Sequence, residues 1–175
     1  MSLLQTVKPE NAEGKVKEAY DYFNGMAGMI PLPIQMVSTS PDILTNLIDT
    51  VKYYVNESNL STSFLAHIRL FISIDEDYTY CINLNQELLK GMCEYDDGSI
   101  DALLNDVNNA LLEKKEIELL KFVIKAVSDP ATTEKSDIVN LNKAGWTDKD
   151  IYEAVNEGLL MLTRGIAFKA FKMAE

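Results

Sequence analysis

The chain has 175 residues, a net charge of −11 and 47% hydrophobic residues, a composition that suits a globular domain with its own core. The acidic balance excludes nucleic acid and anionic membranes as expected partners, because both need a basic surface. The longest apolar runs are far too short to span a bilayer.

Location and cofactors follow from the same composition. The N-terminal residues lack the basic and apolar regions of a signal peptide, and two cysteines do not make a disulfide framework, so a cytoplasmic location is expected. One histidine and two distant cysteines match no metal-ligand spacing, and no Gly-rich phosphate loop is present. We therefore expect neither a metal nor another cofactor.

The first element predicted is a helix that ends near Gly25 or Gly28. Its buried face has the spacing i, i+3, i+4, i+7 and consists of Val16, Ala19, Tyr20 and Phe23. Residues 29–36, "MIPLPIQM", are predicted to be an extended connector, because prolines interrupt a helix.

Two further helices are predicted between residues 40 and 75. Ser40 is a good N-cap and Pro41 suits the first helical position, before an apolar stripe that extends to Val55. The next helix begins near Ser61 or Ser63 and includes "FLAHIRLFISI". The β-branched end of this run also suits a strand, but no partner strand is evident.

The middle of the chain predicts three helices separated by short turns. The first covers residues 78–93, "YTYCINLNQELLKGMC", and stops before "EYDDGS". Ser99 is predicted to cap "IDALLNDV". The third, "EKKEIELLKFVIKAV", has an amphipathic pattern and ends at "SDP".

Two helices complete the chain. Thr132 or Thr133 is predicted to open "EKSDIVNLNKAG", which Gly145 ends as a C-terminal cap. Thr147 opens the last helix, which is apolar nearly all round after Gly158, so we expect burial on several sides. Gly158 and Gly165 lie on one face and allow a close approach. The prediction is one all-α domain, residues 1–175, of about eight helices.

Three stretches of the sequence resemble the AhpD-like superfamily, which includes alkylhydroperoxidase AhpD and the carboxymuconolactone decarboxylases. In that family a helix ends just before a Cys-x-x-Cys-x-x-x-His motif at the start of the next helix, and "FLAHIRLFISIDEDYTYCINLNQELL" follows this layout. Two further stretches are similar to the family's flanking parts, "GMIPLPIQMVSTSPDIL" upstream and "EKKEIELLKFVIKAVSDPATTEKSDIVNLNKAGWTDKDIYEAV" downstream. The resemblance covers nearly the full length and implies a homo-oligomer, as a dimer, trimer or hexamer.

The redox residues of the family are largely absent. Peroxidase members use two cysteines, a histidine and an upstream glutamate; here Tyr78 stands at the first cysteine, Cys81 at the second and Asn85 at the histidine. The glutamate position falls on or near Ala66, beside His67. Tyrosine cannot resolve a sulfenic acid, and asparagine cannot act as a base near neutral pH.

Cys93 is not expected to replace the missing thiol. Twelve residues along one helix separate it from Cys81 by about 18 Å, whereas a disulfide needs Cα atoms within about 7 Å. Cys81 is therefore either a buried structural cysteine or a reactive thiol that acts alone. His67 is either a structural histidine or a weak candidate for proton transfer to Cys81.

Three functions remain open at this point. The favoured one is a non-redox protein that keeps a small-molecule pocket lined by Tyr78, Tyr80 and Asn85 beside Cys81. The second is a one-cysteine peroxidase or antioxidant protein that uses Cys81 on peroxide. The third is a non-catalytic oligomeric module. If the chain is an enzyme, the resemblance implies peroxidase-related or decarboxylase-like chemistry.

Overall fold

The structure is a computed structural model that describes residues 2–173. Over these residues it contains nine α-helices, three short 3-10 helices and no strand, which confirms the all-α prediction. The chain divides into two compact units, residues 1–57 with 166–175, and residues 58–165. The expectation of a single domain stays a prediction.

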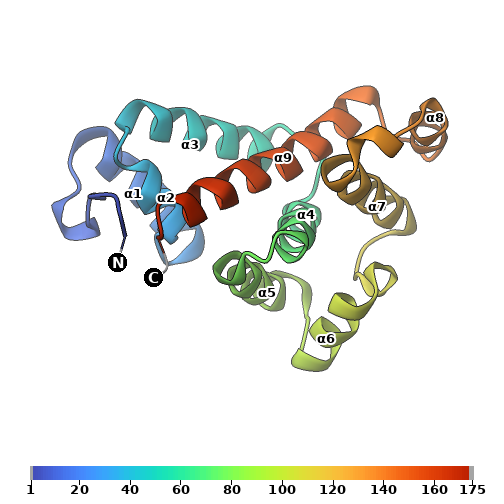
Figure 1. The fold of residues 1–175 in the computed structure, drawn as a ribbon, viewed down its shortest axis with the longest axis horizontal. Helices are drawn as coiled ribbons and strands as arrows, with labels where there is room; N and C mark the ends of the chain where they lie inside the picture. The colour runs from blue at the N-terminus through green and yellow to red at the C-terminus, as the bar shows by residue number, and fades with distance from the viewer. Residues whose placement is uncertain (1, 174–175) are drawn as a thin grey trace. The chain divides into compact units, whose positions relative to one another are not determined.

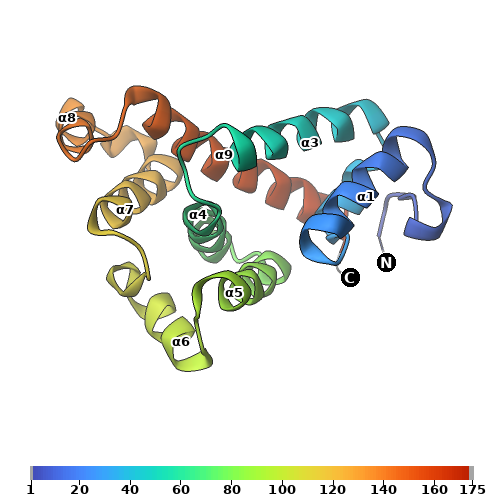
Figure 2. The same cartoon turned by 180° about the vertical axis from the view of Figure 1, so that it is seen from behind.

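The first unit is built around two helices, α1 and α3, which contact each other (Figures 1 and 2). Its elements are η1 (Pro9–Asn11), α1 (Gly14–Ala27), α2 (Leu32–Val37), α3 (Pro41–Asn56) and the end of α9 (Asp148–Ala170). Its core consists of Val16, Ala19, Tyr20, Phe23, Ile34, Leu44 and Ile48. The apolar face predicted for the first helix is therefore confirmed.

The prediction of an extended connector at residues 29–36 is wrong, because α2 forms there. Pro31 is its N-cap, with extended backbone angles, and Pro33 lies in its first turn. A proline at the start of a helix breaks no hydrogen bond, since the first N–H groups have no partner within the helix. Gly28 adopts a left-handed conformation with φ of 68° and ends α1 as predicted.

The second unit places α4 (Thr62–Asp75) in contact with both α5 (Thr79–Cys93) and α7 (Lys114–Ser128), as Figure 1 shows. Its other elements are α6 (Asp97–Asn105), η2 (Val107–Asn109), η3 (Pro130–Thr132), α8 (Lys135–Lys143) and α9 up to Gly165. One core cluster consists of Ala66, Leu70, Leu89, Tyr95, Ile100, Leu103 and Ala110. The run "FLAHIRLFISI" is therefore helical, and α4 is buried among its neighbours.

Two predicted helix starts are wrong. Asp96, and not Ser99, is the N-cap of α6, and Glu134, not Thr132 or Thr133, is the N-cap of α8. In both helices the cap carboxylate accepts a hydrogen bond from the third residue, whose side chain accepts one from the cap's own N–H. This reciprocal arrangement, called a capping box, provides acceptors for two backbone N–H groups. A single hydroxyl group at the N-cap would provide an acceptor for only one.

The turn between α8 and α9 agrees with the prediction. Gly145 has φ of 100° and follows the last residues of α8, while the Trp146 N–H donates to the Leu141 carbonyl at 3.2 Å. Thr147 then opens α9, because its Oγ1 accepts from the Asp150 N–H and Asp150 accepts from the Thr147 N–H. Because Gly145 ends α8 and Thr147 caps the start of α9, the second helix follows the first after a short turn.

The expectation that α9 is buried on several sides after Gly158 is wrong for one side of the helix. Met161 is buried, but Leu159 is 43% exposed, and Tyr152 one heptad earlier is 72% exposed. These exposed side chains of α9 are nevertheless apolar. The hydrophobic pattern of the sequence alone therefore predicts, wrongly, that they are buried.

The two glycines of α9 lie at close contacts, as predicted. A Cβ atom added to Gly158 would lie 2.9 Å from Val127 Cγ2, and one added to Gly165 would overlap the ring of Tyr78. A side chain at either position would require its neighbour to move. Glycine is therefore needed here for space and not for backbone freedom.

We predict that Gly165→Ala destabilises the chain by about 2 kcal/mol, because the new methyl group overlaps an aromatic ring that is itself buried. Gly91→Ala is the matched control, since it also lies within a helix but has no atom within 4 Å of the added Cβ. It should stabilise the chain by about 0.5–1 kcal/mol. Urea unfolding followed by circular dichroism measures both, and equal effects would contradict the packing argument.

Candidate functional site

Tyr78, Cys81 and Asn85 lie together at the start of α5, as their spacing predicts. Tyr78 is the N-cap residue of this helix, and the other two follow on the same face. Their exposed fractions are 5%, 4% and 3%. All three side chains are therefore packed inside the unit, while Tyr80, between them in sequence, is only half-buried.

Asn85 is the centre of a hydrogen-bonded group that connects three helices. Its Nδ2 donates to the Cys81 backbone carbonyl at 2.8 Å, and its Oδ1 accepts from Arg69 Nε at 3.3 Å. Arg69 on α4 forms an ion pair with Glu157 on α9, with 2.9 Å between Nη1 and Oε1. We call Arg69, Glu157 and Asn85 the Arg69 cluster.

The Arg69 cluster carries charge in a mostly buried place. The Glu157 side chain is 5% exposed and that of Arg69 is 26% exposed. A buried carboxylate is costly unless a cation and hydrogen bonds compensate it, and here Arg69 supplies both. This pair was not predicted from the sequence, although Arg69 is the one charged residue within the apolar run "FLAHIRLFISI".

The Cys81 thiol is poorly suited to ionise. Burial raises its pKa from 9.0 to about 11, and the positive charge of Arg164 offsets this only in part. The thiolate is the nucleophilic form, so at pH 7 only about one Cys81 in ten thousand carries the reactive charge. The surroundings of Cys81 thus favour a neutral, packed sulfur.

Tyr78 is a packed aromatic residue at the start of α5. Its hydroxyl group donates to the Leu162 carbonyl of α9 at 3.4 Å, and its ring lies against Gly165. Burial raises the pKa of Tyr78, and the negative charge of Glu76 raises it further. The phenol is therefore neutral and joins α5 to α9.

His67 is fully buried, and other groups engage both of its nitrogens. Nδ1 lies 2.8 Å from the Ser63 carbonyl, which can only accept, so Nδ1 carries the proton. Nε2 then accepts from the Tyr95 hydroxyl at 2.9 Å, and that oxygen accepts from the Leu111 N–H at 2.6 Å. Burial lowers the pKa of His67, which keeps this neutral tautomer in place.

Both cysteines are free thiols, which agrees with the prediction that Cys93 does not pair with Cys81. They lie near opposite ends of α5, which continues as one helix from Thr79 to Cys93. Cys93 Sγ instead lies 2.9 Å from the Ser63 hydroxyl oxygen on α4.

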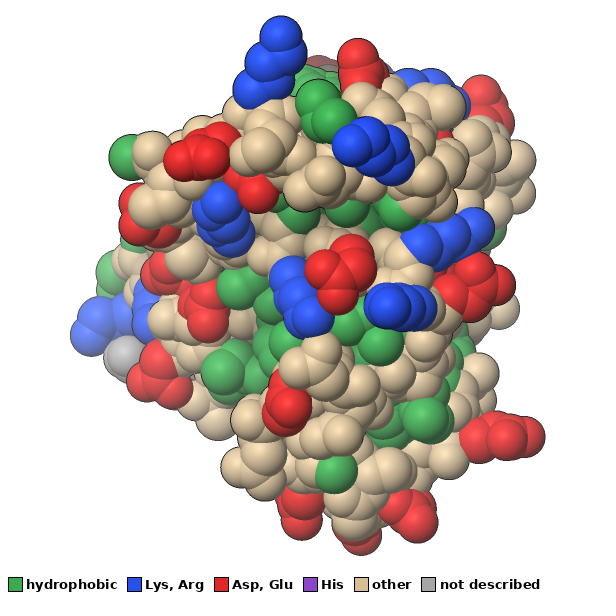
Figure 3. Space-filling view, turned by 90° about the vertical axis from the view of Figure 1, so that its right-hand side faces the viewer, with side chains coloured by type: hydrophobic (Ala, Val, Ile, Leu, Met, Phe, Trp, Pro, Cys, Tyr) green, Lys and Arg blue, Asp and Glu red, His purple; other side chains and the backbone are tan. Residues whose placement is uncertain are grey.

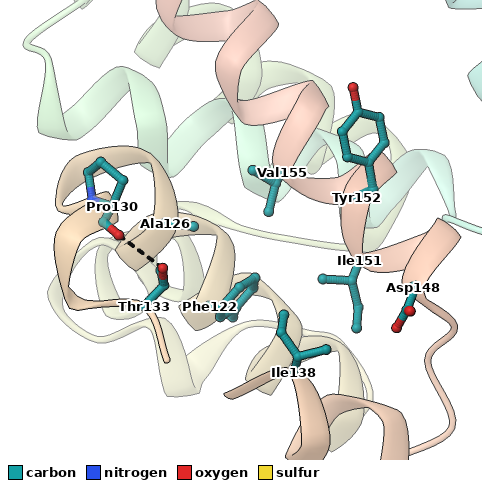
Figure 4. A pocket seen from close by; sticks show the side chains of 9 residues that line it. All are labelled: Phe122, Ala126, Pro130, Thr133, Ile138, Asp148, Ile151, Tyr152 and Val155. Atoms are coloured by element: carbon teal, nitrogen blue, oxygen red, sulfur yellow. Dashed lines mark hydrogen bonds between the residues drawn. The ribbon is translucent and has the colours of Figure 1, made fainter. Parts of the chain in front are cut away.

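A pocket of about 310 Å³ lies elsewhere in this unit, between α7, the η3 turn, α8 and α9 (Figure 4). We call it the α7–α9 pocket, and its lining residues are Phe122, Ala126, Pro130, Thr133, Ile138, Asp148, Ile151, Tyr152 and Val155. None of the residues predicted for the site lines it. The predicted pocket of Tyr78, Tyr80 and Asn85 stays a prediction.

Two features of residues 2–173 bear on other classes of site. No group of three histidine, cysteine or acidic side chains in this range could hold a metal ion, and no helix there is long and apolar enough to cross a membrane. On the face drawn in Figure 3, acidic and basic side chains are interspersed and no histidine is visible, in accord with the burial of His67.

Two solved structures share this fold. An uncharacterized peroxidase-related protein from Ralstonia eutropha JMP134, described as an alkylhydroperoxidase AhpD core, superposes with a TM-score of 0.82 at 14% identity. An uncharacterized peroxidase-related protein from Silicibacter sp. TM1040 gives 0.80 at 18% identity. Each comparison covers 98% of this chain and 90% of the other. No protein-family model and no curated protein sequence matches the chain. At these identities the likeness shows the fold.

We predict that Arg69→Met destabilises the chain by about 3 kcal/mol, because it leaves the Glu157 carboxylate buried without a cation. This is the lower end of the usual range, since a quarter of the Arg69 side chain is exposed. Adding Glu157→Leu to this variant should restore most of the loss. Urea unfolding measures both, with Lys15→Met as a control that breaks an exposed pair and should cause no measurable change.

The environment of His67 predicts a pH-dependent stability. The folded chain holds His67 neutral with a pKa below its ordinary value of 6.5, so the unfolded chain binds the proton more tightly. The free energy of unfolding should therefore be highest above about pH 7.5 and should fall as the pH decreases through about 6.5.

His67→Gln provides the comparison, because His67 is the only histidine of the chain. The variant should be less stable than the parent at about pH 8 and should lose most of the slope between about pH 7.5 and about pH 5.5. Urea titrations at several pH values measure this difference. Parallel curves for the two proteins would contradict a buried neutral imidazole.

Proposed function

We propose that this chain, which has the AhpD-like fold, is a non-redox protein that binds a small molecule and is not a two-cysteine peroxidase. The observation that carries the proposal is the state of Cys81, which is 4% exposed and has a pKa raised to about 11. A thiol that attacks peroxide needs access and a thiolate, and this site disfavours both.

Two-cysteine chemistry also lacks its other parts. A resolving thiol must reach the sulfenic acid, but Tyr78 stands in its place, and Cys93 lies at the far end of α5. A proton carrier must accept and release a proton near neutral pH, but Asn85 is a neutral amide that already bonds to Cys81 and Arg69.

The alternative is a one-cysteine peroxidase, and one observation favours it. Arg164 places a positive charge near Cys81 that lowers the thiol pKa. Burial has the larger effect and the opposite sign, so the alternative requires an opening that exposes the sulfur. The two structural neighbours are described as peroxidase-related, which is why the test below measures peroxide turnover directly.

The small-molecule part of the proposal rests on the α7–α9 pocket. Its volume of about 310 Å³ falls at the lower end of the range found for small-molecule sites, and its wall is largely apolar. The pocket does not depend on the thiol, so binding there is compatible with a silent Cys81. A decarboxylase-like reaction stays a prediction of the resemblance alone.

Assembly into a dimer, trimer or hexamer also stays a prediction. The apolar and exposed side chains of Tyr152 and Leu159 on α9 support it, because such a stripe suits a contact between helices. Sedimentation that finds only a monomer would count against it.

We predict that Cys81 in a Cys93→Ser variant alkylates slowly, with a rate that still rises at about pH 10, because its pKa is about 11. Iodoacetamide labelling followed by mass spectrometry measures the rate, with glutathione as the solvent-exposed reference. Peroxide consumption by this variant should equal that of the Cys81→Ser/Cys93→Ser control. A pKa well below about 8.5 together with turnover would establish the one-cysteine peroxidase instead.

A further inference from the structure

The wall of the α7–α9 pocket comes from three helices that each contribute apolar side chains. Phe122 and Ala126 lie one turn apart on α7, Ile138 is on α8, and Ile151 and Val155 lie one turn apart on α9. Figure 4 shows these side chains around a common space. The small side chain of Ala126 leaves room beside Phe122, so the three helices do not close completely here.

One end of the pocket is formed by a turn whose hydroxyl and carbonyl groups are hydrogen-bonded to each other. The Thr133 hydroxyl donates to the Pro130 carbonyl at 2.9 Å, so its proton is already used. Pro130 itself has no N–H. A ligand therefore meets mainly apolar surface at this end.

The other end carries a charge. Asp148 is the one charged side chain that lines the pocket, and Figure 4 places it on the opposite side of the labelled group from Pro130. Its Oδ1 accepts a hydrogen bond from Asn142 Nδ2 at 3.1 Å. Asp148 is exposed to solvent, so its other oxygen, Oδ2, has acceptor capacity that a ligand can use in place of water.

The charges around this end favour a cation. Asp148 and Asp150 place two carboxylates in the first turn of α9, against about half a positive charge from the helix dipole. The lysines of α7 that flank Phe122 and Ala126 do not compete, because Lys121 is paired with Glu118 and Lys125 with Asp137. The net charge of −11 acts in the same direction over a longer range.

We propose that the α7–α9 pocket binds a small organic cation, an ammonium group on an apolar alkyl or arylalkyl body, with the ammonium on Asp148. The apolar body fills the space between Phe122, Ile138 and Val155, and the ammonium donates to the carboxylate at the open end. Tyr152 also lines the pocket, but Figure 4 shows its ring pointing away from Asp148, so the attraction for the cation comes from the carboxylate. This inference rests on the proposed function, because it names the ligand class of its small-molecule site.

The test compares three probes of similar shape and different charge on the full chain. They are 2-phenylethylammonium, the neutral 2-phenylethanol and the anionic 3-phenylpropanoate, each titrated by calorimetry and by amide chemical shifts. The cation should bind about two- to five-fold more tightly than the alcohol, as one charged hydrogen bond at an exposed carboxylate provides. The anion should bind more weakly than either.

Two variants locate the binding. Asp148→Asn should remove the preference for the cation and leave the affinity for the alcohol unchanged. Asp101→Asn is the matched control, because it removes the same charge from an exposed position on α6 that does not line the pocket. Ala126→Phe should fill the pocket and abolish binding of both probes, and Val155→Phe serves the same purpose if the first variant fails to fold.

The outcomes separate this inference from the proposed function. Equal affinity for cation and alcohol, or a cation preference that survives Asp148→Asn, would overturn the ligand class while a small-molecule site remains. Absence of binding by every probe would overturn both the ligand class and the small-molecule part of the proposed function. A dimer that Ala126→Phe breaks, without probe binding, would assign the pocket to a second copy of the chain and overturn the inference.

Discussion

The burial of α4 is the constraint on which the second unit depends. A polar side chain on a buried helix must find its partner inside the protein, because the loss of water is otherwise uncompensated. His67 meets this requirement with Tyr95 from the turn after α5, and Arg69 meets it with Asn85 on α5 and Glu157 on α9. Each partner comes from a different segment, so these bonds select one rotation of α4 against its neighbours.

The same constraint acts on the start of α5. The Asn85 side chain donates to the Cys81 carbonyl and accepts from Arg69, and Tyr78 joins α5 to α9. These contacts exclude water from Cys81, and burial raises its pKa. A packed sulfur and a reactive sulfur need opposite surroundings, and the contacts around Cys81 favour the packed sulfur.

Sequence patterns predicted correctly the elements that depend on interactions between residues close together in the chain. The apolar face of α1, the Gly145 turn and the Thr147 start each depend on residues within about one turn of each other, and all three are confirmed. The helix α2 was missed because its prolines fall in the first turn, where they are tolerated. The face shared by Tyr78, Cys81 and Asn85 was predictable, but the ion pair of Arg69 joins residues 88 apart, and no local spacing encodes it.

For a related reason, the α7–α9 pocket could not be predicted from patterns within single helices. Phe122 and Val155 belong to separate helices whose apolar faces each predict burial, and a space between such faces appears only when three helices meet. Asp148 is the one charged residue that lines the pocket. The sequence alone explains it as an acidic residue that stabilises the N-terminal end of α9. In three dimensions the same carboxylate also lines an apolar pocket, so one residue serves the start of a helix and the wall of a cavity. The pocket and the packed surroundings of Cys81 share the scaffold of the second unit and no side chain, so a change at one of them can leave the other intact.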